Sequence, residues 1–214
     1  DKDRAKQAIS QLPNLNDAQK HMEDSIIDSQ DTRTNVNQNI TAAQELNGLM
    51  GALKESIKDN ATIISNGNYI NAEPTKKQAY DQAVQHAKDI INGTNQPTIN
   101  KDDVSRATQT VNNTKVALDG DHRLEEAQNT ANQTITNLTN LNNAQKTAEK
   151  QLVNQSPTLE QVQQNLQTAQ DLDRAMGALR QSIANQDQVK SESKYLNEDP
   201  TVKANYDQAV QRAE

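Results

Sequence analysis

The chain repeats itself along its length. Three segments recur at one constant offset of 126 positions: Leu15–Lys20 as Leu141–Lys146, Met50–Leu53 as Met176–Leu179, and Tyr80–Gln85 as Tyr206–Gln211. Aligned at this offset without a gap, 37 of 88 positions are identical. Self-similarity at a fixed period is typical of repeat architectures. The chain therefore contains one complete unit of 126 residues and most of a second.

The absence of gaps constrains the fold. Inserting one residue into a helix turns every following side chain by roughly 100°. Two copies that accept many substitutions but no change of length are therefore expected to be held by packing along whole helices.

Apolar residues follow helical spacing through the unit. One stripe predicts a helix over residues 32–64, roughly 50 Å long at about 1.5 Å per residue. Such a helix can close one bundle and open the next. The stripe consists of Val36, Ile40, Ala43, Leu46, Met50, Leu53 and Ile57. The same reasoning predicts further helices over residues 2–12, 15–29, 74–92, 100–138, 142–155, 157–190 and 200–214.

Capping residues mark the predicted helix starts. Asn16 and Asn142 each precede a Gln by three positions, which is capping-box spacing. Thr158 has the same spacing to Gln161, and Ser156 before a proline is an alternative start. The remaining signals are Asn100 with Asp103, Asp199–Pro200, the weaker Glu73–Pro74, and Gly93 as a helix end.

Residues 67–68 and 95–97 have the composition of loops. The stripe of the 100–138 segment stops at Asp119–Gly120–Asp121 and resumes at Leu124. Either one helix continues through Gly120 or the chain kinks there. We expect continuity with a change of buried face.

Composition favours thin bundles over one thick core. Hydrophobic residues make up 32% of the chain and aromatic residues 2%, with no Trp, Phe or Cys. The net charge is -7, and no basic stripe of the kind that binds nucleic acid is present. We predict an all-α fold of tandem three-helix bundles that share long connecting helices and form an elongated rod. No segment is apolar enough to span a bilayer.

No residue pattern points to catalysis, a metal or a cofactor. His21, His86 and His122 lie far apart, and Thr147 and Arg212 replace the first two in the second copy. The acidic pairs 102–103 and 125–126 fall at helix starts or on polar faces, where no desolvating pocket is expected. We therefore predict a chain that is not an enzyme and binds no metal.

Glycines and tyrosines recur with the repeat. Gly51 and Gly177 are expected to allow close helix approach. Tyr69 and Tyr80 recur as Tyr195 and Tyr206; they could form a stacking platform for a glycan, but their helical spacing favours packing in the core.

The segments 141–146 and 175–179 resemble the repeat region of the giant staphylococcal extracellular-matrix-binding proteins. Residues 4–46 and 124–172 are similar to GA-type modules of that family, and residues 47–120 to its FIVAR module. The resemblance implies four modules: GA-like bundles over 1–46 and 121–173, a FIVAR-like bundle over 47–120, and the start of a second over 174–214.

For function, the resemblance implies an extracellular, cell-wall-associated segment of a longer protein. Its role would be adhesion to host matrix, notably fibronectin, or contact with a cell-wall polymer, weak per unit, and support of wall integrity. From the sequence itself we expect a monomer without cofactors, with secretion and anchoring signals outside this segment.

The alternative implied by the resemblance is a dedicated host-protein-binding module, because some GA modules bind serum albumin. Those modules expose aromatic and apolar residues around their second helix. Here the corresponding positions, within residues 18–23 and 144–149, are polar or small. We therefore assign no ligand-binding residues.

Overall fold

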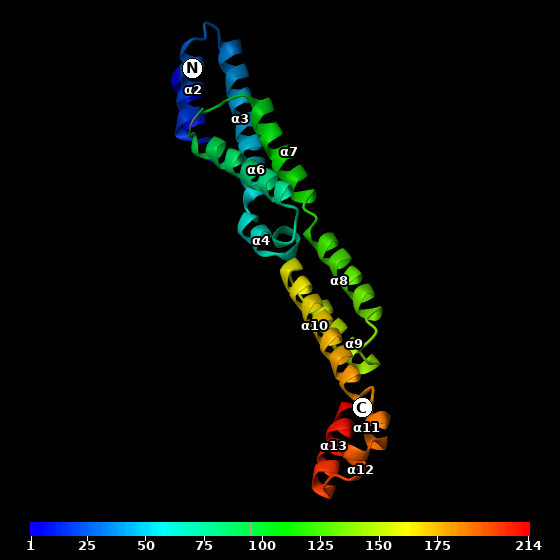
Figure 1. Cartoon of the computed structure of the whole chain (residues 1–214). Helices are drawn as coiled ribbons and strands as arrows, with labels where there is room; N and C mark the ends of the chain where they lie inside the picture. The colour runs from blue at the N-terminus through cyan, green and yellow to red at the C-terminus, as the bar shows by residue number, and fades with distance from the viewer. Residues whose placement is uncertain (95) are drawn as a thin grey trace. The chain divides into compact units, whose positions relative to one another are not determined.

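The computed structural model describes residues 1–94 and 96–214, and these residues form helices and connecting turns with no strand among them. Asn95, in the predicted loop 95–97, lies outside the described residues. The all-α prediction is confirmed. The chain divides into two compact units, Asp1–His122 and Arg123–Glu214. Figure 1 traces the elements from the N-terminus in blue to the C-terminus in red.

The first three helices form a small bundle. They are α1 (Lys2–Ser10), α2 (Asp17–Asp28) and α3 (Arg33–Ile57), and each packs on the other two. Their core contains Ala5, Ile9, Ile27, Val36 and Ala43. Asn16 starts α2 with the predicted capping box, and Thr32 accepts a hydrogen bond from the Asn35 backbone at the start of α3.

The C-terminal half of α3 belongs to a second bundle within the same unit. There α3 packs against α6 (Pro74–Asn92) and α7 (Lys101–Val116), which lie beside it in Figure 1. The short helices α4 (Asn60–Ser65) and α5 (Gly67–Ile70) connect α3 to α6. The core of this bundle draws on α3, α6 and α7 and includes Leu46, Met50, Leu53, Tyr80, Ala83, Val84, Ala87, Val104, Ala107 and Val111.

Unit two repeats this plan as far as the counterpart of α6. The helices α8 (Gly120–Thr136), α9 (Asn143–Asn154) and α10 (Leu159–Ile183) surround a core of Ala131, Ile135, Val153, Val162 and Ala169. Then follow α11 (Gln186–Ser191), α12 (Ser193–Leu196) and α13 (Pro200–Ala213), and α13 packs on α10.

Most predicted caps are confirmed. Asn142 forms a capping box with Gln145, and Thr158, not Ser156, caps α10 by accepting a hydrogen bond from the Gln161 backbone. Gly93 ends α6 with φ of 66°, a left-handed conformation that suits glycine. The weaker Glu73 makes no side-chain cap bond in the described structure.

Two long helices were predicted too long. The predicted helix 32–64 ends at Ile57, and 157–190 ends at Ile183; each is followed by a separate short helix. The backbone N–H of Lys58 bonds to the carbonyl three residues back, at Glu55, which tightens the last turn. Ala184 does the same in the second copy. Residues 67–68, expected to be a loop, begin α5, with the side chain of Asn66 as its cap.

The prediction of a continuous helix through Gly120 was also wrong. α7 ends at Val116, and α8 begins at Gly120. Leu118, between them, is buried in the core of the second bundle. The chain leaves the helical path here because Leu118 packs inward and Gly120 lies against the backbone of α5.

Candidate interaction surfaces

A network of side chains fixes the connection between α7 and α8 to the α5 region. Asn68 Nδ2 donates to the Leu118 carbonyl at 3.2 Å, and its Oδ1 accepts from the Asp121 N–H at 3.1 Å. The Asp119 carboxylate accepts from the Glu73 N–H at 2.9 Å and from Lys76 Nζ at 2.7 Å. These bonds satisfy polar groups on both sides of the helix break.

Gly120 allows this network to form. A Cβ placed on Gly120 would lie 2.4 Å from the Asn68 carbonyl oxygen and 2.5 Å from that of Gly67. Only a residue without a side chain fits against these backbone atoms. The sequence did not indicate this contact, because it joins segments about fifty residues apart.

Two side chains at the start of α2, the cap Asn16 and Gln19, connect the first bundle to the second. Asn16 Nδ2 donates to the Ile90 carbonyl at 3.0 Å and to that of Ile91 at 3.3 Å, at the end of α6. Gln19 is fully buried, and its Nε2 donates to the Thr98 carbonyl at 2.9 Å. These capping residues therefore also hold the two bundles of unit one together.

The repeated glycines accommodate a loop asparagine, which corrects the expectation of close helix approach. A Cβ on Gly51 would lie 2.8 Å from Asn14 Nδ2, and one on Gly177 would lie 2.9 Å from Asn140 Nδ2. Asn14 is itself fixed by its backbone N–H, which donates to Asn47 Oδ1 at 2.8 Å.

The tyrosines form the same pair in both copies. Tyr69 meets Tyr80 edge-on at 6.2 Å between ring centroids, and Tyr195 meets Tyr206 at 6.0 Å. The Tyr69 hydroxyl donates to Asp81 at 2.8 Å, and Lys77 Nζ lies 5.6 Å from the Tyr69 ring centre. Tyr80 is fully buried, which supports packing rather than a glycan platform.

Burial and neighbouring carboxylates act on these phenols. Burial, followed by the charges of Asp59 and Asp81, raises the pKa of Tyr80 to about 12. The Tyr80 hydroxyl is buried and has no hydrogen-bond partner among the described residues. The pKa of Tyr195 is raised first by its hydrogen bond to Asp207 and then by burial. These phenols stay protonated at neutral pH and offer no general base.

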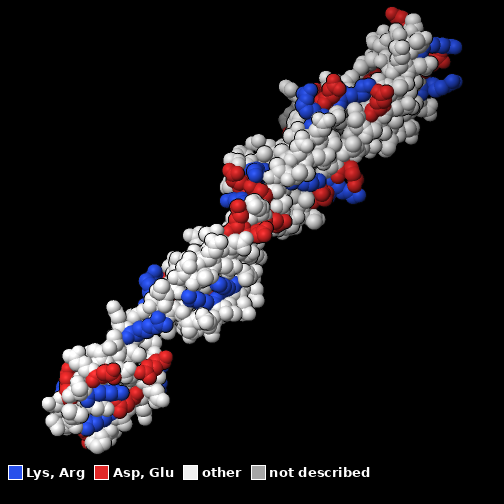
Figure 2. All heavy atoms as spheres, turned by 90° about the vertical axis from the view of Figure 1, so that its right-hand side faces the viewer, with Lys and Arg blue, Asp and Glu red and all other residues white. Residues whose placement is uncertain are grey.

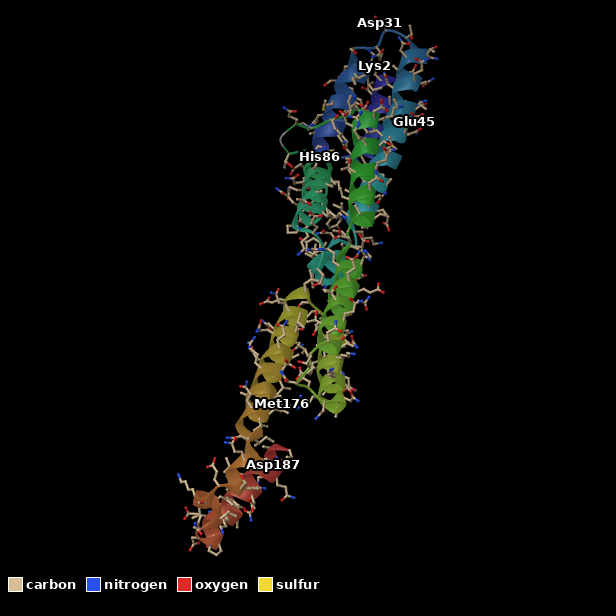
Figure 3. The ribbon with its side chains drawn as sticks, turned by 45° about the vertical axis from the view of Figure 1, so that its right-hand side comes forward. Lys2, Asp31, Glu45, His86, Met176 and Asp187 are labelled. Atoms are coloured by element: carbon tan, nitrogen blue, oxygen red, sulfur yellow. The ribbon has the colours of Figure 1, made fainter. Side chains whose placement is uncertain are left out.

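The three histidines are exposed and lie on different helices: His21 on α2, His86 on α6 and His122 on α8. Figure 3 labels His86 on α6. Within residues 1–94 and 96–214, no three His, Asp or Glu side chains gather where they could hold a metal ion. Asp102 and Asp103 lie in the first turn of α7, where their N–H groups are capped by Asn100.

Open grooves with mixed linings cross the bundles. One of about 360 Å³ between α1 and α3 is floored by Ala5, Val36 and Ile40. A groove of about 470 Å³ occupies the equivalent place between α8 and α10. On the face shown in Figure 2, Lys and Arg are interspersed with Asp and Glu. In the described residues no helix is long and apolar enough to cross a membrane.

The exposed face of α2 and α9, which the alternative of albumin binding would use, carries few apolar groups. Met22 is 36% exposed and Leu152 46% exposed. Their neighbours His21, Thr147 and Ala148 are exposed and polar or small.

Comparison with known proteins covers nearly the whole chain. The FIVAR domain matches residues 49–119 and 175–214, and the GA module matches residues 1–49 and 121–175. The chain is 50% identical over 213 residues to the extracellular matrix-binding protein ebh of Staphylococcus aureus strain MW2, and 51% identical to EbhA of strain Newman. Each match covers all of this chain, but the chain spans only 2% of the length of the first relative and 6% of the second.

Solved structures show the same fold. The crystal structure of an EbhA domain, residues 756–1003, from Staphylococcus aureus superposes with a TM-score of 0.74 at 32% identity, over 78% of this chain and 69% of that one. A second structure, from work on Embp-mediated Staphylococcus epidermidis adherence to fibronectin, gives a TM-score of 0.52 at 37% identity, over 55% of this chain and 93% of that one. By its module matches, the chain belongs to the family of GA-module and FIVAR-domain repeats found in the staphylococcal Ebh proteins.

Proposed function

We propose that this chain is a non-enzymatic repeat segment of a cell-wall-associated surface protein, in which it acts as an extended spacer and a weakly adhesive surface. The observation that carries the proposal is that α3 belongs to two bundles. It packs with α1 and α2 at one end and with α6 and α7 at the other. A helix shared by two small bundles couples their stabilities and fixes their spacing.

The adhesive part of the proposal rests on the relatives. Those with about 50% identity carry the name extracellular matrix-binding protein, and the Embp structure comes from a study of adherence to fibronectin. We propose fibronectin as the matrix partner of this chain too. The shallow grooves and interspersed charges fit weak binding per unit, which repetition on a long chain would strengthen by avidity.

The division into modules over 1–46, 47–120, 121–173 and 174–214 is part of this proposal. The bundles are small, and few of their side chains are large and buried. Small bundles are marginal alone, so neighbours that share helices support one another.

Small-angle scattering tests the spacer role. A compact domain of 214 residues has a radius of gyration of about 17 Å. α3 and α10, of 25 residues each, are each about 38 Å long. An extended spacer should therefore give a radius of gyration well above that of a compact domain. A value near 17 Å would contradict the spacer function.

Binding to immobilised fibronectin tests the adhesive role separately. Immobilised fibronectin should retain the chain weakly, and a tandem dimer of the chain more strongly. If a surface without fibronectin retained the chain and its tandem dimer as strongly as the fibronectin surface does, fibronectin binding would be rejected and the spacer role would stay intact.

A second candidate, albumin binding through α2 or α9, is favoured only by the exposure of Met22 and Leu152. It predicts a saturable calorimetric titration with serum albumin that is lost in Leu152→Lys. A flat titration with the unaltered chain would reject it.

A further inference from the structure

Asparagine is followed by glycine at three places in this chain: Asn47–Gly48, Asn66–Gly67 and Asn92–Gly93. This dipeptide favours spontaneous deamidation, because glycine has no side chain to hinder attack by its own backbone nitrogen on the asparagine amide. The attack requires an asparagine that is free to turn toward that nitrogen, and a backbone N–H that is not held in a hydrogen bond. The three places differ in both respects.

Two of the three pairs are held by their helices. Gly48 lies in the middle of α3, where a backbone N–H donates to the carbonyl four residues back. The side chain of Asn47 is held as well, because its Oδ1 accepts from the Asn14 N–H at 2.8 Å. At the end of α6 the Gly93 N–H donates to the Ile90 carbonyl at 3.2 Å. Either glycine nitrogen can attack only after its helix opens.

Asn66–Gly67 is not held in this way. Asn66 is exposed and non-helical, with φ of -94° and ψ of 162°, and it precedes α5, the short helix that follows α4 in Figure 1. Within residues 1–94 and 96–214, the Gly67 N–H donates to no acceptor. The Asn66 carbonyl accepts from the N–H groups of Tyr69 and Ile70, but α5 has only four residues. A single helical turn opens at little cost.

The second copy of the repeat has Glu192–Ser193 at this place and therefore lacks the reactive pair. Glu192 precedes α12 with a similar extended backbone, φ of -76° and ψ of 145°, and its side chain makes no cap bond in the described structure. A carboxylate is thus compatible with the start of this short helix. Conversion of Asn66 to an acid would leave the local fold intact as long as the main chain is unchanged.

We propose that Asn66–Gly67 is a site of spontaneous deamidation, and that its isoaspartyl product loosens the connection between α7 and α8. The Gly67 nitrogen loses its proton to water and bonds to Asn66 Cγ, and the side-chain nitrogen leaves as ammonia. Water then opens the succinimide ring. Breaking the bond from nitrogen to Cγ gives aspartate, and breaking the bond from nitrogen to the main-chain carbonyl carbon gives isoaspartate. The sum consumes a water and releases an ammonia.

The two products differ in their effect on the fold. Aspartate keeps the main chain as it is, and its carboxylate can cap α5 as the asparagine does. Isoaspartate adds a carbon to the main chain directly before Gly67 and Asn68, whose carbonyl oxygens lie against Gly120. Asn68 also bonds to the Leu118 carbonyl and to the Asp121 N–H. Displacement of these residues would therefore weaken the bonds that fix the α7–α8 connection. This inference does not depend on the proposed adhesive function.

Peptide mapping of the full chain during incubation at mildly alkaline pH tests the site. Mass spectrometry follows the conversion of amide to acid, and enzymatic methylation identifies isoaspartate. In the folded chain Asn66 should react at least about tenfold faster than Asn47 and Asn92, because even a small free energy of helix opening slows a reaction by that factor. In urea that unfolds the chain, the three rates should converge, since all three pairs have the same chemistry.

Gly67→Ala is the matched variant. A Cβ at this position would lie 3.4 Å from Asp121 Oδ1, an ordinary contact, and Gly67 does not have the positive φ found at Gly93. The fold should therefore accept alanine, which circular dichroism verifies. Its methyl group hinders the attack, so deamidation at Asn66 should slow many-fold while Asn92 reacts as before.

Hydrogen exchange of the Asp121 amide tests the structural consequence. This amide should exchange faster in incubated chains that contain isoaspartate at position 66 than in fresh chains, because its acceptor Asn68 is displaced. Asn66→Asp adds the charge without the extra main-chain carbon and should keep the amide protected.

Three results would overturn the proposal. In the first, Asn66 reacts no faster than Asn47 and Asn92 in the folded chain. In the second, isoaspartate accumulates at position 66 and the exchange of the Asp121 amide does not change. In the third, Asn66→Asp loses protection to the same extent as the isoaspartyl chain, which would assign the effect to charge instead of the lengthened main chain.

Discussion

Replacing Gly120 by alanine should destabilise unit one, although alanine is the better helix former. The added Cβ would lie 2.4 Å and 2.5 Å from two backbone oxygens of residues 67 and 68. Because these are main-chain atoms, the contact can relax only if α5 and the start of α8 move apart. Overpacking of this kind costs about 1–3 kcal/mol.

The movement would also break bonds. The two Asn68 hydrogen bonds, to the Leu118 carbonyl and the Asp121 N–H, contribute about 1 kcal/mol each. Up to about 1 kcal/mol returns from the helix propensity of alanine. The net loss is therefore about 2–4 kcal/mol, which lowers the urea midpoint by roughly 1–2 M for a domain of this size.

Gly48→Ala is the matched control, because a Cβ there meets nothing within 4 Å in the middle of α3. It should stabilise the unit by about 1 kcal/mol. Urea unfolding and exchange of the Asp121 amide measure both variants. A Gly120→Ala chain as stable as wild type, with its Asp121 amide still protected, would refute the reasoning.

Three further predictions follow from other contacts. Asn16→Ala should cost about 1 kcal/mol more in urea unfolding than Asn142→Ala, because Asn16 both caps α2 and bonds to the end of α6; equal losses would show that the α6 bonds contribute nothing. The pKa of Tyr80 is about 12 against an ordinary 10.0, so its folded form keeps the proton that the unfolded form loses. Stability should fall between pH 10 and 12, and Tyr80→Phe should reduce that slope, whereas an unchanged slope would assign the loss to other groups. Burial, with Asp24 adding and Lys101 opposing, raises the pKa of Glu23 above 4.5, so Glu23→Gln should stabilise the chain at pH 7 and make no difference at about pH 3; a gain of the same size at both pH values would contradict this assignment.

Local signals were sufficient to place most helix starts and the faces that helices bury. The stripe from Val36 to Leu53 did become the core of unit one, and Asn16, Asn142 and Thr158 did cap their helices. These features depend on residues three or four apart, which periodicity and capping spacing report directly.

Helix ends that depend on distant partners could not be predicted. The stripe continues past Ile57 into Ile63, yet α3 stops where Lys115 reaches over to the Ser56 carbonyl at 3.0 Å and to Asp59. Asp119–Gly120 was ambiguous for the same reason, since Asn68 and Lys76 decide the break from another helix. Such contacts join positions 40 to 60 residues apart and leave no local pattern.

Sharing α3 between two bundles also affects how unit one responds to a pulling force. If α1 and α2 detach, the N-terminal half of α3 loses its partners, whereas its C-terminal half keeps α6 and α7. The 32 residues before α3 can then lengthen to about 110 Å while the rest of the unit stays folded. A surface protein made of such units would yield to shear in steps, each reversible while the remaining half of α3 templates refolding.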